Sequence, residues 1–253
     1  MKISVITVAF NSASTIADTL TSVAAQTHSD IEHIVIDGQS TDDTVSVVKA
    51  HQHPQLTLSS EPDDGIYDAM NKGLRRACGE VIGFLNADDL FADEQVLARV
   101  AAAFESPEIS ACFGDLVYVT KDNQKIVRFW KSKPFQKGYF ANGWCPAHPT
   151  FYIRRSALER LGAFDLTYLI AADAEFMMRY LESGGIQATY IPHVQVRMRV
   201  GGASNKSWSN VVAGNREIFN ALRKNAIPYS TFLFWAHKIA SRLRQRLTAK
   251  FKN

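Results

Sequence analysis

Four short apolar runs alternate with helix-like segments in the first ninety residues, and each run is followed directly by polar residues. The runs cover residues 2–10, 31–36, 56–58 and 81–85. Between them, apolar residues such as Ile16, Leu20 and Val23 recur at helical spacing. Strands joined by helices in this way run parallel, so the pattern predicts an open, mainly parallel α/β sheet flanked by helices. In such a sheet the ligand site lies at the carboxyl ends of the strands.

After residue 90 the alternation gives way to strand-rich and irregular sequence. We expect a helix over 93–104, strands over 111–119, 125–130 and 150–153, and helices over 155–161 and 173–183. The Gly-, Pro- and aromatic-rich stretch between residues 133 and 149 predicts an irregular loop. This organisation indicates one domain over residues 1–217, with halves at 1–110 and 111–217, and a tail over 218–253.

The net charge of +3 is distributed unevenly along the 253 residues. Residues 218–253 contain eight Lys and Arg and no Asp or Glu, so the tail carries +8 and the rest of the chain −5. A basic tail on an acidic body needs an explanation of its own and argues against a general affinity for nucleic acid.

The cysteines and the N-terminus bear on the cellular compartment. Cys78, Cys112 and Cys145 are widely spaced and odd in number, which fits a reducing compartment better than a disulfide scaffold. The first apolar run stops at Asn11 and is too short for a signal peptide or a membrane span. We therefore expect a cytoplasmic protein.

Two polar segments follow the second and third predicted strands. Residues 37–44 combine the Asp37 carboxylate, a glycine that lets the backbone turn, and hydroxyls that cap a helix, which suits a base or a ribose. Residues 61–73 place acids before a helix, with Asn71 and Lys72 where they could reach a diphosphate. Taken singly, a well-capped turn and a solvated helix start explain the two segments equally well.

The third polar segment, residues 86–89, reads Asn-Ala-Asp-Asp and ends the fourth predicted strand. Clustered oxygens at a strand end suit a hard divalent cation, Mg or Mn, that takes further ligands from substrate phosphates. Such an ion stabilises the negative charge on a departing diphosphate. An acidic turn without an ion is the alternative interpretation.

The three segments together resemble the family 2 glycosyltransferases, which have the GT-A fold, and most closely their bacterial surface-polysaccharide branch. They carry the strings DGQSTDDT, DDGIYDAMNKG and GEVIGFLNADD in this order and at this spacing, and the resemblance extends over residues 1–205. It implies that Asn86 and Asp88 occupy the outer positions of the family's Asp-x-Asp metal motif, with Asn in place of the first Asp. It also implies a set of residues that hold the nucleotide: Thr7, Ala9, Phe10, Asp37 and Asp64.

The same resemblance assigns the chemistry of the second half. Within residues 171–179, Asp173 matches the family's catalytic base, with Ala172 where the family usually has Glu. An inverting transfer needs one carboxylate to take the proton of the acceptor hydroxyl as it attacks opposite the leaving diphosphate. His148 matches residues on the acceptor side, and residues 201–204 match a loop that closes over the donor.

The implied activity is inverting transfer of a sugar from a UDP- or dTDP-sugar to a saccharide or lipid-linked saccharide in bacterial cell-surface polysaccharide biosynthesis. A non-catalytic nucleotide-sugar-binding module is one alternative, and Asn86 and Ala172 are its only support. A sugar-phosphate nucleotidyltransferase is another. That enzyme would need a glycine-rich, basic loop after the first strand, and residues 9–13 contain neither glycine nor a basic residue.

The tail contains an amphipathic helix with an apolar and a basic side. Basic residues flank the apolar face and acids are absent, which is typical of a helix lying in an anionic membrane interface. A helix packed on the domain with a solvated basic side is the alternative. The membrane interpretation predicts an enzyme on the inner face of the plasma membrane. Over residues 229–251 the apolar face consists of Phe232, Trp235, Ile239, Leu243 and Leu247.

Overall fold

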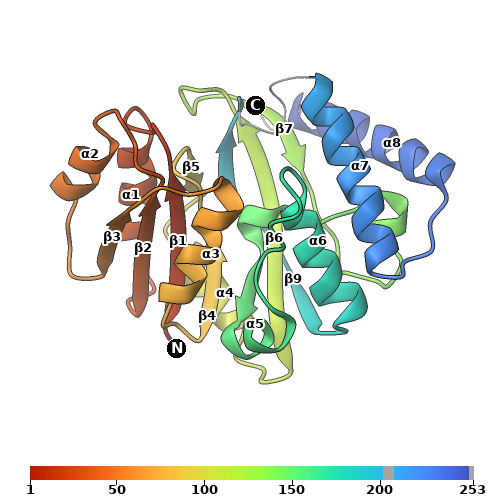
Figure 1. Ribbon diagram of the computed structural model, residues 1–253, viewed down its shortest axis with the longest axis horizontal. Coiled ribbons are helices and arrows are strands. Elements are labelled where there is room, and N and C mark those ends of the chain that lie inside the picture. The colour runs from red at the N-terminus through yellow and green to blue at the C-terminus, as the bar shows by residue number, and fades with distance from the viewer. Residues whose placement is uncertain (202–207, 251–253) are drawn as a thin grey trace.

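The computed structural model describes residues 1–201 and 208–250. Its strands form one nine-stranded sheet in the order β3-β2-β1-β4-β8-β6-β9-β5, with β7 paired to β6. Helices lie on both faces of this sheet (Figure 1). The α/β class predicted from the sequence is therefore confirmed, and so is the presence of a C-terminal helix.

The parallel half of the sheet contains the four strands predicted in the first ninety residues. They are β1 (Ile3–Ala9), β2 (Ile31–Asp37), β3 (Leu56–Ser60) and β4 (Val81–Phe84). β1 pairs with β2 and β4, and β2 pairs with β3, all in parallel. The ends of the predicted elements shift by a few residues, because caps and turns set them. The connecting helices are α1 (Ile16–Ala24), α2 (Thr44–Ala50) and α3 (Ile66–Arg76).

The second half of the chain adds strands in both directions. β8 lies antiparallel between β4 and β6 and so joins the two halves in one sheet. β9 runs parallel to β6 and antiparallel to β5, while β7 runs antiparallel to β6. The sheet is thus parallel in its first half and mixed in its second. The added strands are β5 (Asp89–Phe91), β6 (Ile109–Val119), β7 (Ile126–Trp130), β8 (Tyr152–Arg154) and β9 (Gln187–Arg199).

Sequence reasoning missed β5, β9 and the helix α7 (Trp208–Lys224). β5 has three residues, too few for a periodic signal. β9 contains Pro192 and shifts its register with β6, so its buried and exposed side chains do not alternate cleanly. These elements form because they pair or pack with segments elsewhere in the chain.

Two layers of helices cover the sheet, whose side chains point alternately to one layer and the other. α3, α5 and α6 pack on the face where Ile6 and Val8 of β1 point. α1, α2 and α4 pack on the opposite face, where Val5 and Ala9 point. Both faces of β1 and β4 are buried, as their continuous apolar runs predict. The bounds of the remaining helices are α4 (Val96–Ala103), α5 (Arg155–Leu161) and α6 (Ala172–Met178).

The C-terminal helix α8 (Thr231–Lys250) packs on the domain with one side. Phe234 is buried in the core, with its ring centroid 4.9 Å from that of Phe219 on α7. The Lys238 amine donates a hydrogen bond to Oδ1 of Asn215 at 2.7 Å, which ties α8 to α7. α8 therefore packs on the domain, as the alternative interpretation of the tail expects.

α8 packs against a turn and a strand. The short 3-10 turn Phe140–Asn142 is followed by Gly143, whose φ is +70°. A Cβ at Gly143 would lie 3.1 Å from the carbonyl oxygen of Phe234, so the close approach of α8 favours glycine there. On β7, Nε of Arg128 donates to Oε1 of Gln245 at 2.6 Å. These contacts fix the helix along most of its described length.

The described part of the apolar face predicted for the tail lies on the outer side of α8, and the Leu247 side chain lies outside the described residues. Phe232 is 79% exposed, Ile239 55% and Leu243 58%. The boundary expected at residue 217 lies inside α7. Among the helices of the described residues, none is long and apolar enough to cross a bilayer.

We expect Phe234→Ala to lower the free energy of unfolding by about 3 to 5 kcal/mol, because it removes a fully buried aromatic side chain and leaves a cavity. Phe232→Ala, on the outer side of the same helix, should change it by less than about 0.5 kcal/mol. Urea denaturation followed by circular dichroism measures both values. Equal stability of the two variants would contradict the docking of α8.

Candidate active site

The loops after β1 and β2 are held together at the carboxyl edge of the sheet. The backbone N–H of Gly38 donates to the carbonyl of Ala9 at 2.9 Å. Asn11, with a φ of +49°, donates its backbone N–H to Oγ of Ser40 at 2.8 Å and accepts from the N–H of Thr41 at 2.9 Å. These bonds make a fixed rim at the edge where ligands of parallel sheets bind.

Asp37 ends β2 beneath this rim. Its buried carboxylate accepts hydrogen bonds from Oγ of Ser60 at 2.6 Å, from the backbone N–H of Ser40 at 3.0 Å, and from the Ser40 hydroxyl. Gly38 approaches the Asp63 carboxylate so closely that a Cβ would overlap it. Asp37 therefore organises the loop, and its direct contact with a nucleotide stays a prediction.

The predicted donor residues of β1 lie at different depths. Phe10 is 63% exposed just beyond the strand, and Ala9 is buried at its end. Thr7 is fully buried, and its hydroxyl shares a hydrogen bond with Nε2 of His33 at 3.0 Å. Burial lowers the pKa of His33 to about 3, so the imidazole is neutral at ordinary pH. The Thr7 side chain thus links β1 to β2, and a contact of Thr7 with the nucleotide stays a prediction.

Asp64 and Lys72 lie at the start and on the second turn of α3. Asp64 is exposed, and its backbone N–H donates to Oδ2 of Asp68 at 3.2 Å. The Lys72 amine lies 3.3 Å from the same carboxylate oxygen and also donates to the carbonyl of Pro62. Asp64 follows Asp63, whose carboxylate lies close to Gly38 of the rim. The contacts of Asp64 and Lys72 with a donor stay predictions.

Asn71 has a different partner from the one expected. Its side chain is buried, donates from Nδ2 to the carbonyl of Phe164 at 3.0 Å and accepts the Phe164 N–H on Oδ1 at 2.9 Å. This two-way bond ties α3 to the second half of the chain. A contact of Asn71 with a diphosphate stays a prediction.

Asn86 and Asp88 follow β4 and are partly exposed, whereas Asp89 begins β5 and is fully buried. Burial raises the pKa of Asp88, and the charge of Arg199 opposes this shift. Burial raises the pKa of Asp89 well above its usual range, and the charge of Asp88 adds to the effect. The Asn86 side chain and the Arg199 backbone favour ionised Asp89 only weakly, and neither Asp89 oxygen receives a hydrogen bond of ordinary geometry from the described residues. Burial and the neighbouring Asp88 carboxylate thus favour the neutral form of Asp89, and Asp88 is the more exposed acid of the pair.

The chemistry of Asn86 and Asp88 fits a divalent cation that is bound mainly through its substrate. Within residues 1–201 and 208–250, no three His, Cys, Asp or Glu side chains come together as a ready-made metal site. Mg²⁺ commonly binds one or two carboxylates and takes its other ligands from phosphates and water. A cation beside Asp88 would also offset the unfavourable burial of that carboxylate's charge.

Arg199 at the end of β9 holds the loop of this motif in place. Its Nη1 donates to the carbonyl of Asp88 at 3.1 Å, and its Nη2 pairs with the carboxylate of Asp18 on α1. The strand β9 was not predicted, so no sequence pattern pointed to this contact. Residues 202–204 of the closing loop expected just beyond it lie outside the described residues.

Asp173 lies in the first turn of α6 and contacts the first half of the chain through Tyr67 of α3. Its Oδ1 accepts the N–H of Ala174 at 2.8 Å and lies 3.2 Å from the Tyr67 hydroxyl. The same hydroxyl is 2.8 Å from the carbonyl of Ile170, so it donates to one of the two at a time. Burial, with the charge of Asp173, raises the pKa of Tyr67 well above its usual range, so Tyr67 stays a donor. The cap of α6 is Ala171, so helix capping does not explain Asp173.

Glu217 of α7 holds the segment that leads into Asp173, and sequence reasoning missed it. Its carboxylate accepts three backbone N–H groups, from Leu169 at 3.0 Å, Ile170 at 2.9 Å and Ala171 at 2.8 Å. Charge-assisted bonds of this kind fix the entry into α6. Glu217 lies 46 to 48 positions away in sequence, so no local motif marks it.

Glu175, the other acid in this helix, is committed to ion pairs. It is fully buried and lies 3.1 Å from Nη2 of Arg179 and 3.0 Å from the Lys224 amine. A carboxylate with two cationic partners in the interior is a structural tie between α6 and α7. Asp173 is therefore the acid of this segment whose carboxylate can take part in a reaction.

His148 packs among aromatic rings beside Asp173. Its ring centroid lies 5.1 Å from that of Phe84 and 5.6 Å from that of Phe164. Burial lowers its pKa, and the charge of Asp173 opposes the shift. Its Nε2 has no hydrogen-bond partner among the described residues. A contact of His148 with an acceptor stays a prediction.

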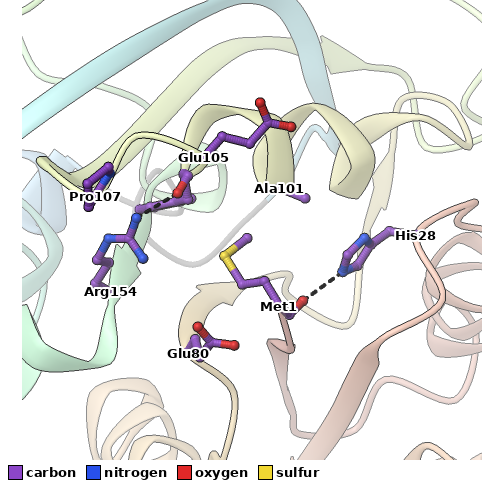
Figure 2. A pocket seen from close by; sticks show the side chains of 8 residues that line it. Met1, His28, Glu80, Ala101, Glu105, Pro107 and Arg154 are labelled. Atoms are coloured by element: carbon purple, nitrogen blue, oxygen red, sulfur yellow. Dashed lines mark hydrogen bonds between the residues drawn. The ribbon is translucent and has the colours of Figure 1, made fainter.

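A separate cavity lies at the opposite edge of the sheet, where β1 and β4 begin. Figure 2 shows Met1, Glu80 and Arg154 around it, with His28 bonded to the carbonyl of Met1 at 3.0 Å. Its volume is about 460 Å³. Because Met1 and Glu80 directly precede β1 and β4, this cavity is remote from the strand ends that carry Asp37 and Asp88.

Comparison with known families shows to which family the chain belongs. The family described as Glycosyl transferase family 2 matches residues 4–162, which is more than half of the chain. This chain is a family 2 glycosyltransferase. The matched residues include both loops of the rim and the motif with Asn86 and Asp88.

Two mycobacterial relatives of this glycosyltransferase are similar over most of its length. An uncharacterized glycosyltransferase of Mycobacterium tuberculosis is 34% identical over 184 residues, which cover 70% of this chain and 68% of the relative. A PGL/p-HBAD biosynthesis glycosyltransferase of Mycobacterium bovis is 31% identical over 208 residues, which cover 80% and 78%. Both carry the name of the same enzyme class.

Solved structures share the fold of this glycosyltransferase. TarS of S. aureus (residues 1–349), in complex with UDP-GlcNAc, superposes with a TM-score of 0.66 at 20% identity, covering 90% of this chain and 66% of TarS. A mannosyltransferase from Pyrobaculum calidifontis, in complex with GDP-Man and Mn²⁺, gives 0.66 at 21% identity, covering 98% and 73%. At these identities the similarity concerns the fold, and it confirms the GT-A-like class predicted from the sequence.

We expect Asp88→Ala to abolish the Mn²⁺-dependent part of nucleotide binding, because it removes the charged carboxylate of the motif. Asn86→Asp should leave that part unchanged or strengthen it. Isothermal titration of UDP with and without Mn²⁺ measures the difference. Asp93→Ala, which removes an exposed acid paired with Arg99, is the control. Unchanged Mn²⁺ dependence in Asp88→Ala would contradict the metal assignment.

Proposed function

We propose that this enzyme transfers a sugar, with inversion, from a UDP- or dTDP-sugar to a saccharide or lipid-linked saccharide in the synthesis of a bacterial surface polysaccharide. The observation that carries the proposal is the Asp173 carboxylate. It is partly buried, it is positioned from both halves of the chain, and one of its two oxygens is left for a substrate.

The hydrogen bonds of Asp173 suit a general base. Both bonds that the described residues make to its carboxylate, from Tyr67 and Ala174, reach Oδ1. Oδ2 is therefore the oxygen that can accept the proton of an acceptor hydroxyl. As the hydroxyl oxygen bonds to the anomeric carbon, the bond to the diphosphate on the opposite side breaks, and the configuration inverts.

The rim of the parallel strands suits the donor. Phe10 and Asp64 are exposed there, and Lys72 lies on α3 just behind Asp64. A divalent cation, Mg²⁺ or Mn²⁺, would be held by Asp88 and Asn86 and would neutralise charge on the diphosphate. The UDP-GlcNAc bound to TarS, and the GDP-Man and Mn²⁺ bound to the mannosyltransferase, support a nucleotide-sugar donor and a metal here.

We infer that the enzyme binds its acceptor at the cytoplasmic face of the plasma membrane. The outer side of α8 exposes Phe232, Ile239 and Leu243 in a tail that has no acids. Apolar side chains flanked by Lys and Arg favour an anionic membrane interface. A relative named for PGL/p-HBAD biosynthesis supports transfer to an acceptor in a biosynthetic pathway.

We expect Asp173→Asn to fold normally and bind donor, because the amide oxygen of Asn can still accept from Tyr67 and Ala174. Its kcat should fall by about a hundredfold or more, the usual scale for losing a general base. The donor is identified first, as the UDP-, dTDP- or GDP-sugar that raises the melting temperature of the wild type with Mn²⁺. Release of nucleoside diphosphate then measures turnover.

Asp30→Asn is the matched control, because Asp30 precedes β2 at the far edge of the sheet. It should keep wild-type turnover. Near-normal turnover in Asp173→Asn would place the base elsewhere. Donor binding by the wild type without turnover, in the presence of a range of saccharide acceptors, would favour the non-catalytic binding module.

A further inference from the structure

The helices α7 and α8 lie side by side at the edge of the molecule farthest from β3 (Figure 1) and enclose a groove on their outer side. Its volume is about 730 Å³. The apolar lining comes from Val211, Val212 and Phe219 on α7, Tyr229 between the helices, and Trp235 on α8. A groove with this lining can take up an apolar chain.

Three arginines line the same groove: Arg216 and Arg223 on α7, and Arg242 on α8. All three are exposed, and none has an acidic partner among the described residues. Among the described residues, Arg223 bonds to neutral groups, the side-chain oxygen of Asn220 and the hydroxyl of Tyr229. The rim of the groove therefore carries concentrated positive charge beside an apolar lining.

Acids that bind to α7 or lie on it have other partners. Glu217 accepts three backbone N–H groups on the inner side of α7. Asp165 and Glu175 pair with Lys224 at 2.7 and 3.0 Å. Residues 218–253 contain no acid at all. The charge of the groove is thus left for a partner outside the chain.

Exposed apolar surface continues from the groove along α8. Val212, in the groove, is 67% exposed. Trp235 shares a helical face with Phe232 and Ile239, because residues three and four positions apart are neighbours on a helix. A contiguous exposed apolar surface of this kind marks an interaction site.

The chemistry of the surface selects its partner. A second copy of the chain, in a two-fold contact, would bring the arginines of one groove against those of the other. A free phosphate would leave the apolar lining uncovered, and a nucleic acid would leave Phe232 and Ile239 in water. An anionic amphiphile satisfies the arginines and the apolar side chains together.

We propose that the groove between α7 and α8 binds an anionic phospholipid of the membrane, with its phosphate among the three arginines and the start of an acyl chain on the apolar lining. This deepens the membrane partner of the proposed function and rests on it. α7 would then contact lipid on its outer side while Glu217 on its inner side positions the segment before Asp173. The catalytic half of the enzyme would be the half that faces the bilayer.

The test uses variants of α7, because membrane binding by α8 alone would not depend on the side chains of α7. Full-length protein is cosedimented with phosphatidylcholine vesicles that contain or lack phosphatidylglycerol. The wild type should bind the anionic vesicles at low salt and release them as salt rises. Arg216→Gln with Arg223→Gln should lower the partition coefficient about tenfold or more, since each basic residue at an anionic surface contributes about fivefold. Val212→Ser should weaken the binding that persists at high salt.

The matched control is Arg75→Gln with Arg160→Gln, which removes the same charge from exposed positions on α3 and α5. It should change the partition coefficient by less than about twofold. A second measurement is the melting temperature with dihexanoyl-phosphatidylglycerol below its micelle concentration. This soluble lipid should stabilise the wild type, and neither inorganic phosphate nor the phosphatidylcholine analogue should.

Several results would overturn the proposal. These are no vesicle binding by the wild type at low salt, equal binding to neutral vesicles, an equal loss in the control, or a dimer in light scattering that Val212→Ser abolishes. Donor-dependent stabilisation is measured on the same samples. A wild type that binds donor but no lipid contradicts only the groove, whereas one that binds lipid but no donor contradicts the proposed transferase chemistry.

Discussion

The parallel hydrogen-bond ladder that places β1 between β2 and β4 is the constraint on which the rest of the molecule depends. Because the strands run the same way, Asp37 at the end of β2 and Asn86 just beyond β4 are brought to one edge. The Gly38 N–H to Ala9 bond and the Asn11 bonds then join neighbouring loops into a rim. Backbone hydrogen bonds between the strands therefore bring the parts of this half of the site together.

The second half of the site depends on contacts between residues distant in sequence. β8 joins the halves through antiparallel pairing with β4 and β6. Asn71 is bonded to the backbone of Phe164, 93 positions away, and Tyr67 reaches Asp173 across 106 positions. The carboxylate proposed as the base is therefore positioned by the same segment that was predicted to bind the donor. This arrangement couples the geometry of donor and acceptor sides through α3.

Buried acids near the site differ in their partners. Asp89 and Glu175 are both fully buried, yet among the described residues Asp89 forms no ion pair, whereas Glu175 pairs with Arg179 and Lys224. Burial, with the charge of Asp88, raises the pKa of Asp89 well above its usual range. Asp88 and Asp173, each partly exposed, are the acids left at the two sides of the site. α7 adds to this arrangement from outside, with Glu217 on its inner side and arginines on its outer side.

The sequence by itself determined the α/β class, the four parallel strands with their helices, and the edge where the polar segments meet, because these follow from local periodicity and from the direct succession of strand and turn. The resemblance to the family also singled out Asp88 and Asp173. Only the tertiary structure decided that Thr7 and Asn71 are buried ties, that Asp89 is fully buried, and that Glu217, Tyr67 and Arg199 position the site. It also decided that α8 packs on the domain and still exposes its apolar face. Each of these outcomes depends on burial or on a partner far away in the chain, and neither is written in the local sequence.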